Sequence, residues 1–249
     1  MGIWTDRFRL IRRLFDTPYC ERVSNALWKG RMAWVQEQAA CVPAGSKVLD
    51  VGAGPCPYRE NFAHCQYIAH DFAQTPGVPY GTIDVISDIC SIPLPDGSFD
   101  VVLCTEVLEH VPEPVQALHE MHRLLKTGGM LILTAPLGSG QHQKPYHFYG
   151  GFTRFWYEHF LPRAGFQIES LEPCGGLYGH LVEMTWRTRS MLHGAGRYTL
   201  MGRVREFLWQ LLLYNLPAVV FERWERANLV EDFSVGFLCV AVKRDAPAR

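Results

Sequence analysis

The sequence has little of several features that would place it in a specialised class of protein. Its 8 cysteines among 249 residues include no C-x-x-C pair, and the chain contains no run of 18 or more apolar residues. The cysteine pattern argues against a disulfide framework and favours a reducing, cytoplasmic setting. The longest apolar stretch, 207–221, is interrupted by Gln210, Asn215 and Pro217, so we expect no membrane-spanning helix. Arginines break up the apolar residues near the start, so we expect no signal peptide.

An excess of charge of one sign is also lacking. The chain has 24 Lys and Arg residues against 25 Asp and Glu residues, a formal net charge of −1. This balance gives no reason to expect a nucleic-acid partner. The histidines and cysteines lack the paired spacings typical of metal ligands, so we expect no metal centre. No internal repeat or low-complexity linker interrupts the sequence, which predicts one domain over residues 1–249.

Short apolar runs alternate with helical patterns through the middle of the chain. The runs that predict strands are 47–51, 67–69, 83–86, 101–104, 130–135, 166–171 and 233–242. Helical spacing is clearest over 115–125 and 153–164, and a turn is predicted over 126–129. This alternation predicts an α/β fold, a Rossmann-like, doubly wound sheet of seven mostly parallel strands.

Four parts of the chain follow from this pattern. We predict a helical cap over 1–44, a cofactor-binding core over 45–176, a helical insertion over 177–228, and the final strand and tail over 229–249. The insertion is rich in Trp, Leu and Arg, which leaves two interpretations open. Its apolar residues either pack on the core or form a roof over an apolar acceptor, with arginines of 185–226 contacting anionic headgroups at a membrane surface.

A glycine-containing turn, within VLDVGAGPCPY at 48–58, follows the first predicted strand. Gly52 and Gly54 permit a tight turn that lets a ligand approach the backbone. Asp71 closes the second strand, where a carboxylate can accept both hydroxyls of a ribose. Asp88 closes the third strand, where it can accept a hydrogen bond from an adenine amino group. Because an open parallel sheet binds ligands at the carboxyl ends of its strands, these residues predict a nucleoside site.

Two kinds of nucleoside ligand compete for this site. A dinucleotide requires G-x-G-x-x-G, but Pro57 stands at the third glycine and has no N–H group. Asp50, two residues before Gly52, would repel a pyrophosphate. The same carboxylate suits the ammonium and sulfonium groups of S-adenosylmethionine (SAM), so the residues favour SAM.

The motifs also resemble a known family. In order, VLDVGAGPCPY, YIAHD, DVISDICSIPLPDGSFDVV, CTEVLEHVPEP and LLKTGGMLILTAP are similar to the successive motifs of class I SAM-dependent methyltransferases. The resemblance covers about residues 45–172, and is greatest to the subgroup that includes the ubiquinone/menaquinone C-methyltransferases. One departure is Cys56, where the family commonly has a third glycine.

The resemblance implies which residues contact the cofactor. Asp50, Gly52 and Gly54 would line its methionine moiety, Asp71 would hold the ribose, and Asp88 and Ile89 would contact the adenine. Thr105 and Glu106 would contact the cofactor beyond the fourth strand. The implied set also includes Val51, Ala53 and Phe72.

Methyl transfer is an in-line displacement, and a hydroxyl or acidic carbon must lose a proton to act as the nucleophile. Histidine is the residue type best suited to accept it near neutral pH. His147 is our first candidate for the general base and His110 the second, because both follow predicted strands. We expect the segment 137–150, which contains His147, to cover the substrate. Histidines in such loops also serve only to shape a pocket, and an acceptor that is already nucleophilic needs no base.

These observations predict methyl transfer from SAM to a small-molecule or lipid-like acceptor, at oxygen or carbon rather than nitrogen. Two alternatives stay open. A non-catalytic SAM-binding or regulatory protein would keep the same cofactor residues without transferring a methyl group. A nucleotide-dependent oxidoreductase is disfavoured by Pro57 and Asp50.

Overall fold

The structure is a computed structural model. It describes residues 30–177, 179–181, 184, 208, 212, 220, 224 and 231–244. Contacts divide the chain into two compact units, residues 1–30 with 175–235 and residues 31–174 with 236–249. The second unit contains the sheet and all the predicted site residues. Most of the predicted cap and insertion lie outside the described residues, and the single domain stays a prediction.

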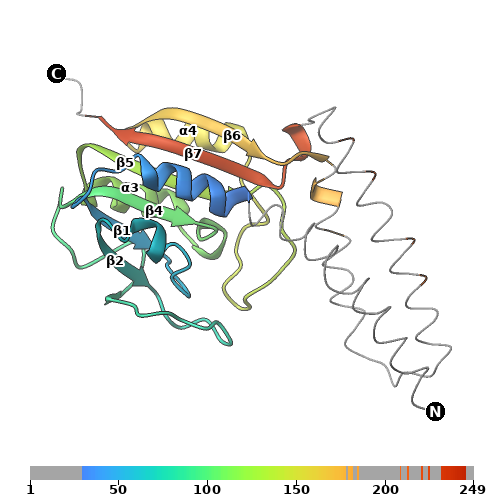
Figure 1. Cartoon of the computed structure of the whole chain (residues 1–249). Helices are drawn as coiled ribbons and strands as arrows, with labels where there is room; N and C mark the ends of the chain where they lie inside the picture. The colour runs from blue at the N-terminus through green and yellow to red at the C-terminus, as the bar shows by residue number, and fades with distance from the viewer. Residues whose placement is uncertain are drawn as a thin grey trace, which may run out of the picture. The chain divides into compact units, whose positions relative to one another are not determined.

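The sheet has seven strands in the order β3-β2-β1-β4-β5-β7-β6. The strands are β1 (Lys47–Val51), β2 (Gln66–Asp71), β3 (Val85–Ile86), β4 (Phe99–Thr105), β5 (Leu125–Pro136), β6 (Phe166–Cys174) and β7 (Gly236–Lys243). Neighbouring strands from β3 to β5 are parallel, and β7 is antiparallel to both β5 and β6 (Figure 1). The seven-stranded, mostly parallel sheet is therefore confirmed.

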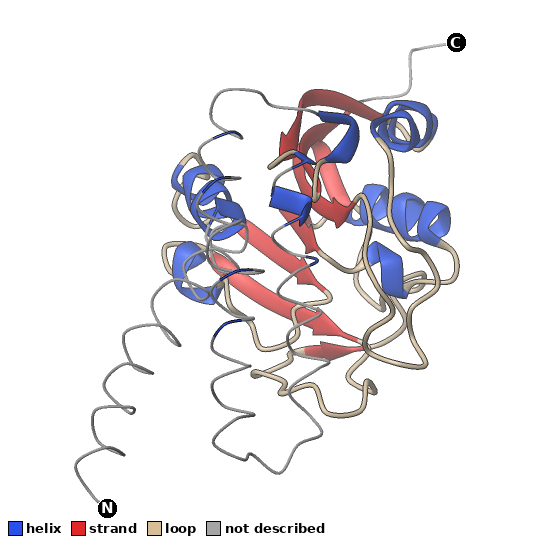
Figure 2. Ribbon diagram, turned by 90° about the vertical axis from the view of Figure 1, so that its right-hand side faces the viewer, coloured by secondary structure: helices blue, strands red, loops and turns tan. Residues whose placement is uncertain are grey.

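Both faces of the sheet are buried, as the continuous apolar strands predicted. Successive residues of β4 alternate between two hydrophobic clusters. Val101 and Leu103 join the cluster that contains Val35 of the helix over 30–40. Val102 and Cys104 join the other cluster, which includes residues of α3 (Pro114–Leu124) and α4 (Arg154–Arg163). Figure 2 shows helices on both sides of the sheet, which is the arrangement of a doubly wound fold.

The strand boundaries differ from most of the predicted ones by a few residues, and two differences change an element. The turn expected over 126–129 lies within β5, because Phe99 pairs with Leu125 while Val101 pairs with Met130. The residues between these two pairings form an irregularity in the ladder rather than a connection between elements. The last strand begins at Gly236, three residues later than expected, because Glu231–Phe233 form the short helix η4.

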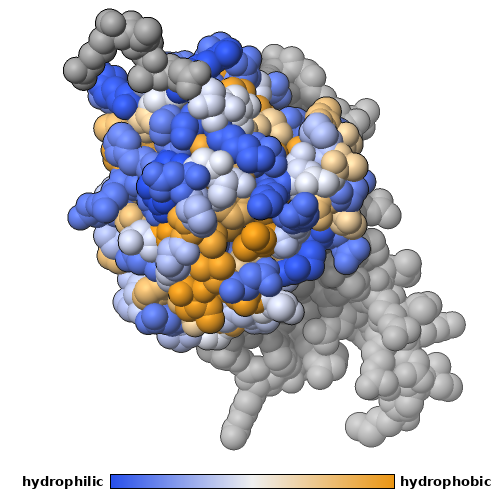
Figure 3. All heavy atoms as spheres, turned by 90° about the vertical axis from the view of Figure 1, so that its left-hand side faces the viewer, coloured by the Kyte–Doolittle hydropathy of each residue, from blue (hydrophilic) through white to orange (hydrophobic). Residues whose placement is uncertain are grey.

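The carboxyl ends of the parallel strands lie on the right in Figure 1, where the loop after β5 extends beyond the sheet. Figure 3 shows the face at the opposite end of the strands, where hydrophobic side chains gather in one area bordered by hydrophilic ones. Apolar atoms contribute much of the surface of any folded protein, so this area alone indicates no binding site. Among the described residues, no helix has both the length and the apolar character needed to cross a membrane.

Candidate active site

The predicted glycine turn leaves β1 at Val51 and folds back against the end of β2. Gly52 has φ +74°, and a Cβ atom on it would overlap the side chain of Val107, so only glycine fits. The N–H groups of Gly52 and Ala53 donate to the carbonyl oxygen of His70, at 2.8 and 2.9 Å. The N–H of Gly54 donates to the carboxylate of Asp71 at 2.9 Å. All three N–H groups therefore have partners within the protein, which leaves none of them to hold a pyrophosphate.

Cys56, the departure from the family pattern, has a backbone conformation that explains the glycine common at this position. Its φ is +55°, in the left-handed region that L-residues with a side chain rarely adopt. Its thiol lies 3.6 Å from the carbonyl oxygen of Thr82 and 4.0 Å from the guanidinium of Arg59. Arg59 begins the short helix η1 (Arg59–Phe62). A cysteine thus occupies a turn that glycine would adopt at lower cost.

Asp50 is buried at the start of the site, with its side chain directed toward Tyr67 of β2. The tyrosine hydroxyl donates a short hydrogen bond to the Asp50 carboxylate. The pKa of Asp50 is raised to about 7, mainly by burial; the bond from Tyr67 lowers it and the negative charge of Asp71 raises it. A positively charged ligand would offset this cost of ionising Asp50.

Sequence reasoning missed Tyr67, although the register of the strands could have indicated it. Asp50 is paired with Ala69, two residues beyond Tyr67 on β2. Side chains two residues apart in a strand point to the same face. Tyr67 and Asp50 therefore lie on one face of the sheet once the two strands are aligned.

The aspartates predicted to bind ribose and adenine lie at the ends of two adjacent strands. Asp71 ends β2 and also accepts the N–H of Ala73 at 2.7 Å. Asp88 follows β3, is exposed, and accepts the N–H of Cys90 at 2.8 Å. Ile89 is half-buried against the core. Contacts of these residues with a nucleoside stay predictions, since each aspartate also has a local role in its turn.

Thr105 and Glu106 lie where β4 ends. Glu106 has φ +55°, and its carboxylate accepts one hydrogen bond and forms one ion pair. The hydroxyl of Thr134 donates to it at 3.0 Å, and the Arg31 guanidinium lies 3.2 Å away. Arg31 comes from the helix over 30–40, and no motif in the sequence indicated it. Only the packing of that helix against the sheet brings the arginine to this end of the site.

The two predicted catalytic histidines lie together, with a third histidine beside them. His110 ends the short helix η2 (Leu108–His110), while His142 and His147 belong to the loop after β5. The ring centroids are 4.7 Å apart for His110 and His142, 5.6 Å for His110 and His147, and 4.7 Å for His142 and His147. The sequence indicated both segments but not that they meet.

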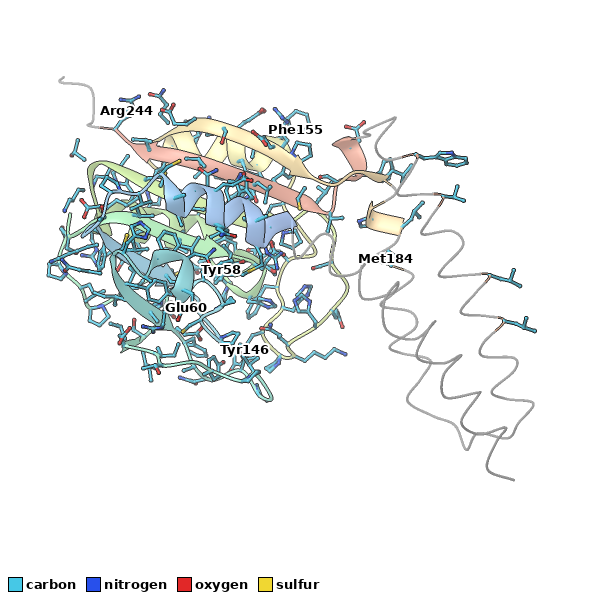
Figure 4. The ribbon with its side chains drawn as sticks, in the orientation of Figure 1. Tyr58, Glu60, Tyr146, Phe155, Met184 and Arg244 are labelled. Carbon is cyan, nitrogen blue, oxygen red and sulfur yellow. The ribbon has the colours of Figure 1, made fainter. Side chains whose placement is uncertain are left out.

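The loop after β5 is held over the carboxyl ends of the strands by several contacts. The N–H groups of Phe148 and Tyr149 donate to the Glu109 carbonyl oxygen at 2.8 and 3.2 Å. The rings of Tyr146 and Phe72 meet edge to face at 5.5 Å, and Figure 4 labels Tyr146 on this loop. Phe72 follows Asp71, so the loop contacts the predicted cofactor residues, as a cover over the substrate would.

The environment of His110 favours an uncharged imidazole. Burial lowers the pKa of His110, the nearby His142 and His147 lower it further, and the carbonyl oxygen of Tyr146 acts in the opposite direction. A neutral His110 that donates from Nδ1 to this carbonyl keeps a lone pair on Nε2. His147 pairs with the hydroxyl of Ser139 through Nε2 at 3.0 Å. Either histidine could accept a proton, and the assignment of His147 as the base stays a prediction.

Comparisons with known proteins agree with this arrangement. Residues 49–133 match the family described as "Methyltransferase domain". The ubiquinone biosynthesis O-methyltransferase of Pseudomonas aeruginosa is 33% identical over 117 residues, which are 42% of this chain and 49% of that protein. The chain thus spans about half the length of the curated relatives it matches.

Two solved structures show the same fold at low sequence identity. The [4+2]-cyclase SpnF has a TM-score of 0.55 and 19% identity, with 85% of this chain and 81% of that chain covered. Phosphoethanolamine N-methyltransferase 2 of Haemonchus contortus, solved with S-adenosylhomocysteine, has a TM-score of 0.51 and 17% identity, covering 87% and 53%. A cyclase and a methyltransferase share this architecture, so the fold alone does not determine the reaction. The matched family, the motifs and the strand order agree: residues 49–133 are similar to a methyltransferase domain, as the resemblance to class I SAM-dependent methyltransferases predicted.

Proposed function

We propose that this protein transfers the methyl group of SAM to a small molecule, at an oxygen or a carbon atom. The observation that carries the proposal is the buried Asp50 carboxyl beside a glycine turn whose N–H groups already have partners. Such a site disfavours a phosphate and suits the cationic methionine portion of SAM. Asp71, at the end of the adjacent strand, would accept the ribose hydroxyls.

The contribution of the protein to this reaction is mainly positioning. An acceptor atom must approach the methyl group in line with the bond from carbon to sulfur. A bond then forms between the acceptor and the methyl carbon, the bond from carbon to sulfur breaks, and S-adenosylhomocysteine leaves. The acceptor proton passes to a base, for which His147 is our first candidate and His110 the second. The loop over 137–150 would keep water out during transfer.

We propose further that the acceptor is apolar. Three aromatic residues of the loop, Tyr146, Phe148 and Tyr149, support this, and so does the similarity to an O-methyltransferase of ubiquinone biosynthesis. Arginines of 185–226 would attach the protein to anionic membranes. Co-sedimentation with vesicles of anionic lipid at low salt tests this attachment, and a protein that stays in the supernatant contradicts it.

The experiment that tests the proposed transfer uses SAM with an isotopically labelled methyl group. The full chain is incubated with this SAM and a bacterial extract, and labelled products are identified by mass spectrometry. We expect a labelled small molecule that is absent with the Asp71→Asn variant. A protein that binds SAM but labels no compound, in this extract or in a panel of phenols and catechols, would instead be a non-catalytic SAM-binding protein.

A further inference from the structure

Near His147, the first candidate for the general base, the side chains of three other residues lie close together. Glu109 and His110 come from η2, and His142 comes from the loop after β5. One possible ligand atom of each lies within 4.8 Å of the others. Nε2 of His110 is 3.7 Å from a carboxylate oxygen of Glu109. Two imidazoles and one carboxylate form a donor set that binds divalent transition-metal ions in many proteins.

The hydrogen bonds around the two histidines leave one nitrogen of each ring available. Nδ1 of His110 lies 2.5 Å from the Tyr146 carbonyl oxygen, and Nδ1 of His142 lies 2.9 Å from the Gly140 carbonyl oxygen. A carbonyl oxygen only accepts, so in each ring Nδ1 carries the hydrogen and Nε2 keeps its lone pair. Metal-binding histidines usually have this arrangement, because the bond at the outer nitrogen fixes the tautomer and the ring orientation.

Two of the buried atoms at this point lack a hydrogen bond. Among the described residues, neither Nε2 of His110 nor Oε2 of Glu109 has a hydrogen-bond partner. The Glu109 side chain is only 2% exposed. Burying polar atoms without partners costs free energy, and proteins retain such groups mainly where a ligand or a function compensates. A cation between the three side chains would satisfy both atoms.

We propose that Glu109, His110 and His142 bind one divalent transition-metal ion, of which Zn²⁺ is the representative. Ligand atoms at about 2.1 Å from such an ion lie at most about 4.2 Å apart, so the three side chains must close slightly. His142 lies on a loop and is half-buried, which gives it room to move. The sequence expectation of no metal centre rested on spacing, and spacing could not indicate a site whose ligands lie 32 positions apart, from His110 to His142.

The site has a consequence for the reaction, and this part alone rests on the proposed function. Three protein ligands leave a coordination position for an oxygen atom of water or of the acceptor. A metal ion lowers the pKa of an oxygen it binds. With His110 engaged as a ligand, His147 is then the histidine left to receive the acceptor proton.

Metal binding can be measured without SAM or an acceptor. We would titrate tag-free, EDTA-treated full chain with Co²⁺, following the visible absorption of the bound ion, and then displace it with Zn²⁺. We expect one equivalent to bind. We also expect His142→Ala to weaken binding at least about tenfold, and Glu109→Gln to weaken it similarly while keeping the shape of the side chain. His119→Ala, an exposed histidine of α3, is the matched control and should bind as the wild type does.

The outcomes separate this proposal from the proposed methyl transfer. No stoichiometric Co²⁺ binding by the wild type, or unchanged binding by both His142→Ala and Glu109→Gln, overturns the metal site. The thermal unfolding of each variant shows whether lost binding reflects an unfolded protein, and His142→Ala should unfold as the wild type does. SAM binding measured in EDTA on the same preparations tests the cofactor site separately.

Discussion

The Nδ1 atom of His110 lies 2.5 Å from the carbonyl oxygen of Tyr146. This bond joins the segment after β4 to the loop after β5, across 36 positions of the chain. It fixes the orientation of the His110 ring and holds the loop that carries His147 beside it. The same loop meets Phe72, next to the predicted ribose contact. Cofactor site and histidine cluster are thus parts of one arrangement at the carboxyl ends of the strands.

Replacing His147 tests its assignment as the general base. We expect His147→Gln to lower kcat for the identified acceptor by about 10²–10⁴-fold, with little change in KM, because proton transfer is lost while binding is kept. The pH profile of kcat should also lose its acidic limb. His119→Gln should leave both parameters unchanged. A kcat of His147→Gln within about threefold of the wild type would show that the reaction needs no base at this position.

Replacing Gly52 tests the tight turn after β1. We expect Gly52→Ala to cost about 2–4 kcal/mol, because the new methyl group meets Val107 and the residue keeps a left-handed backbone. Gly54→Ala should cost only about 1–2 kcal/mol, since a Cβ atom there meets no atom within 4 Å. Denaturant unfolding without SAM measures both values. In a Val107→Ala background the cost of Gly52→Ala should fall to that of Gly54→Ala, and an unchanged cost would contradict the steric explanation.

The stability of the ligand-free protein should depend on the ionisation of Asp50. Its folded-state pKa is raised to about 7 from an ordinary value of 3.8. Between these pH values the folded state binds more protons than the unfolded state, so this contribution to stability is full below pH 3.8 and is lost as the pH rises toward 7.

The Asp50→Asn variant isolates this effect from the other carboxyl groups. Its amide oxygen can still accept the bond from Tyr67 but does not ionise. Urea unfolding at several pH values should show that the variant gains stability relative to the wild type as the pH rises from about 4 to about 8. If the difference in stability between the variant and the wild type is constant over this pH range, Asp50 has an ordinary pKa.

Removing Arg31, which pairs with Glu106 just after β4, should destabilise the folded protein. The Arg31 and Glu106 side chains are 21% and 32% exposed, and Glu106 already has a strained backbone. We expect Arg31→Met to lower the free energy of unfolding by about 1–2 kcal/mol. Arg244→Met is the control, because Arg244 and Glu169 form an ion pair with 58% and 44% exposed side chains. Such exposed pairs contribute less than about 1 kcal/mol, and equal losses in the two variants would contradict a special role for Arg31.

The sequence predicted the sheet well because local patterns specify strands that are buried on both faces. The run at 101–104 lies within β4, and the run at 47–51 forms β1 with the predicted bounds. The sequence also indicated the glycine turn and Asp71, since the turn directly follows β1 and Asp71 ends β2. Chain-local patterns carry this information, and they need no knowledge of packing.

The remaining parts of the site depend on contacts that the sequence does not encode locally. Arg31 reaches Glu106 only because a helix packs on the sheet, and Glu109 lies near His142 only because the loop after β5 folds back toward η2. The position of Tyr67 beside Asp50 can be inferred only from the register of β1 and β2. In each case the partners are distant in sequence, so no spacing rule could bring them together.

The most direct test of the central claim is calorimetric titration of the full chain with SAM and, separately, with NADH. Asp71→Asn tests the ribose contact, and Asp96→Asn, a change at a side chain that is 79% exposed, is the control. We predict that the wild type and Asp96→Asn bind one SAM, that Asp71→Asn binds it about 10–100-fold more weakly, and that NADH gives no binding heat. Binding of NADH without binding of SAM would contradict the account.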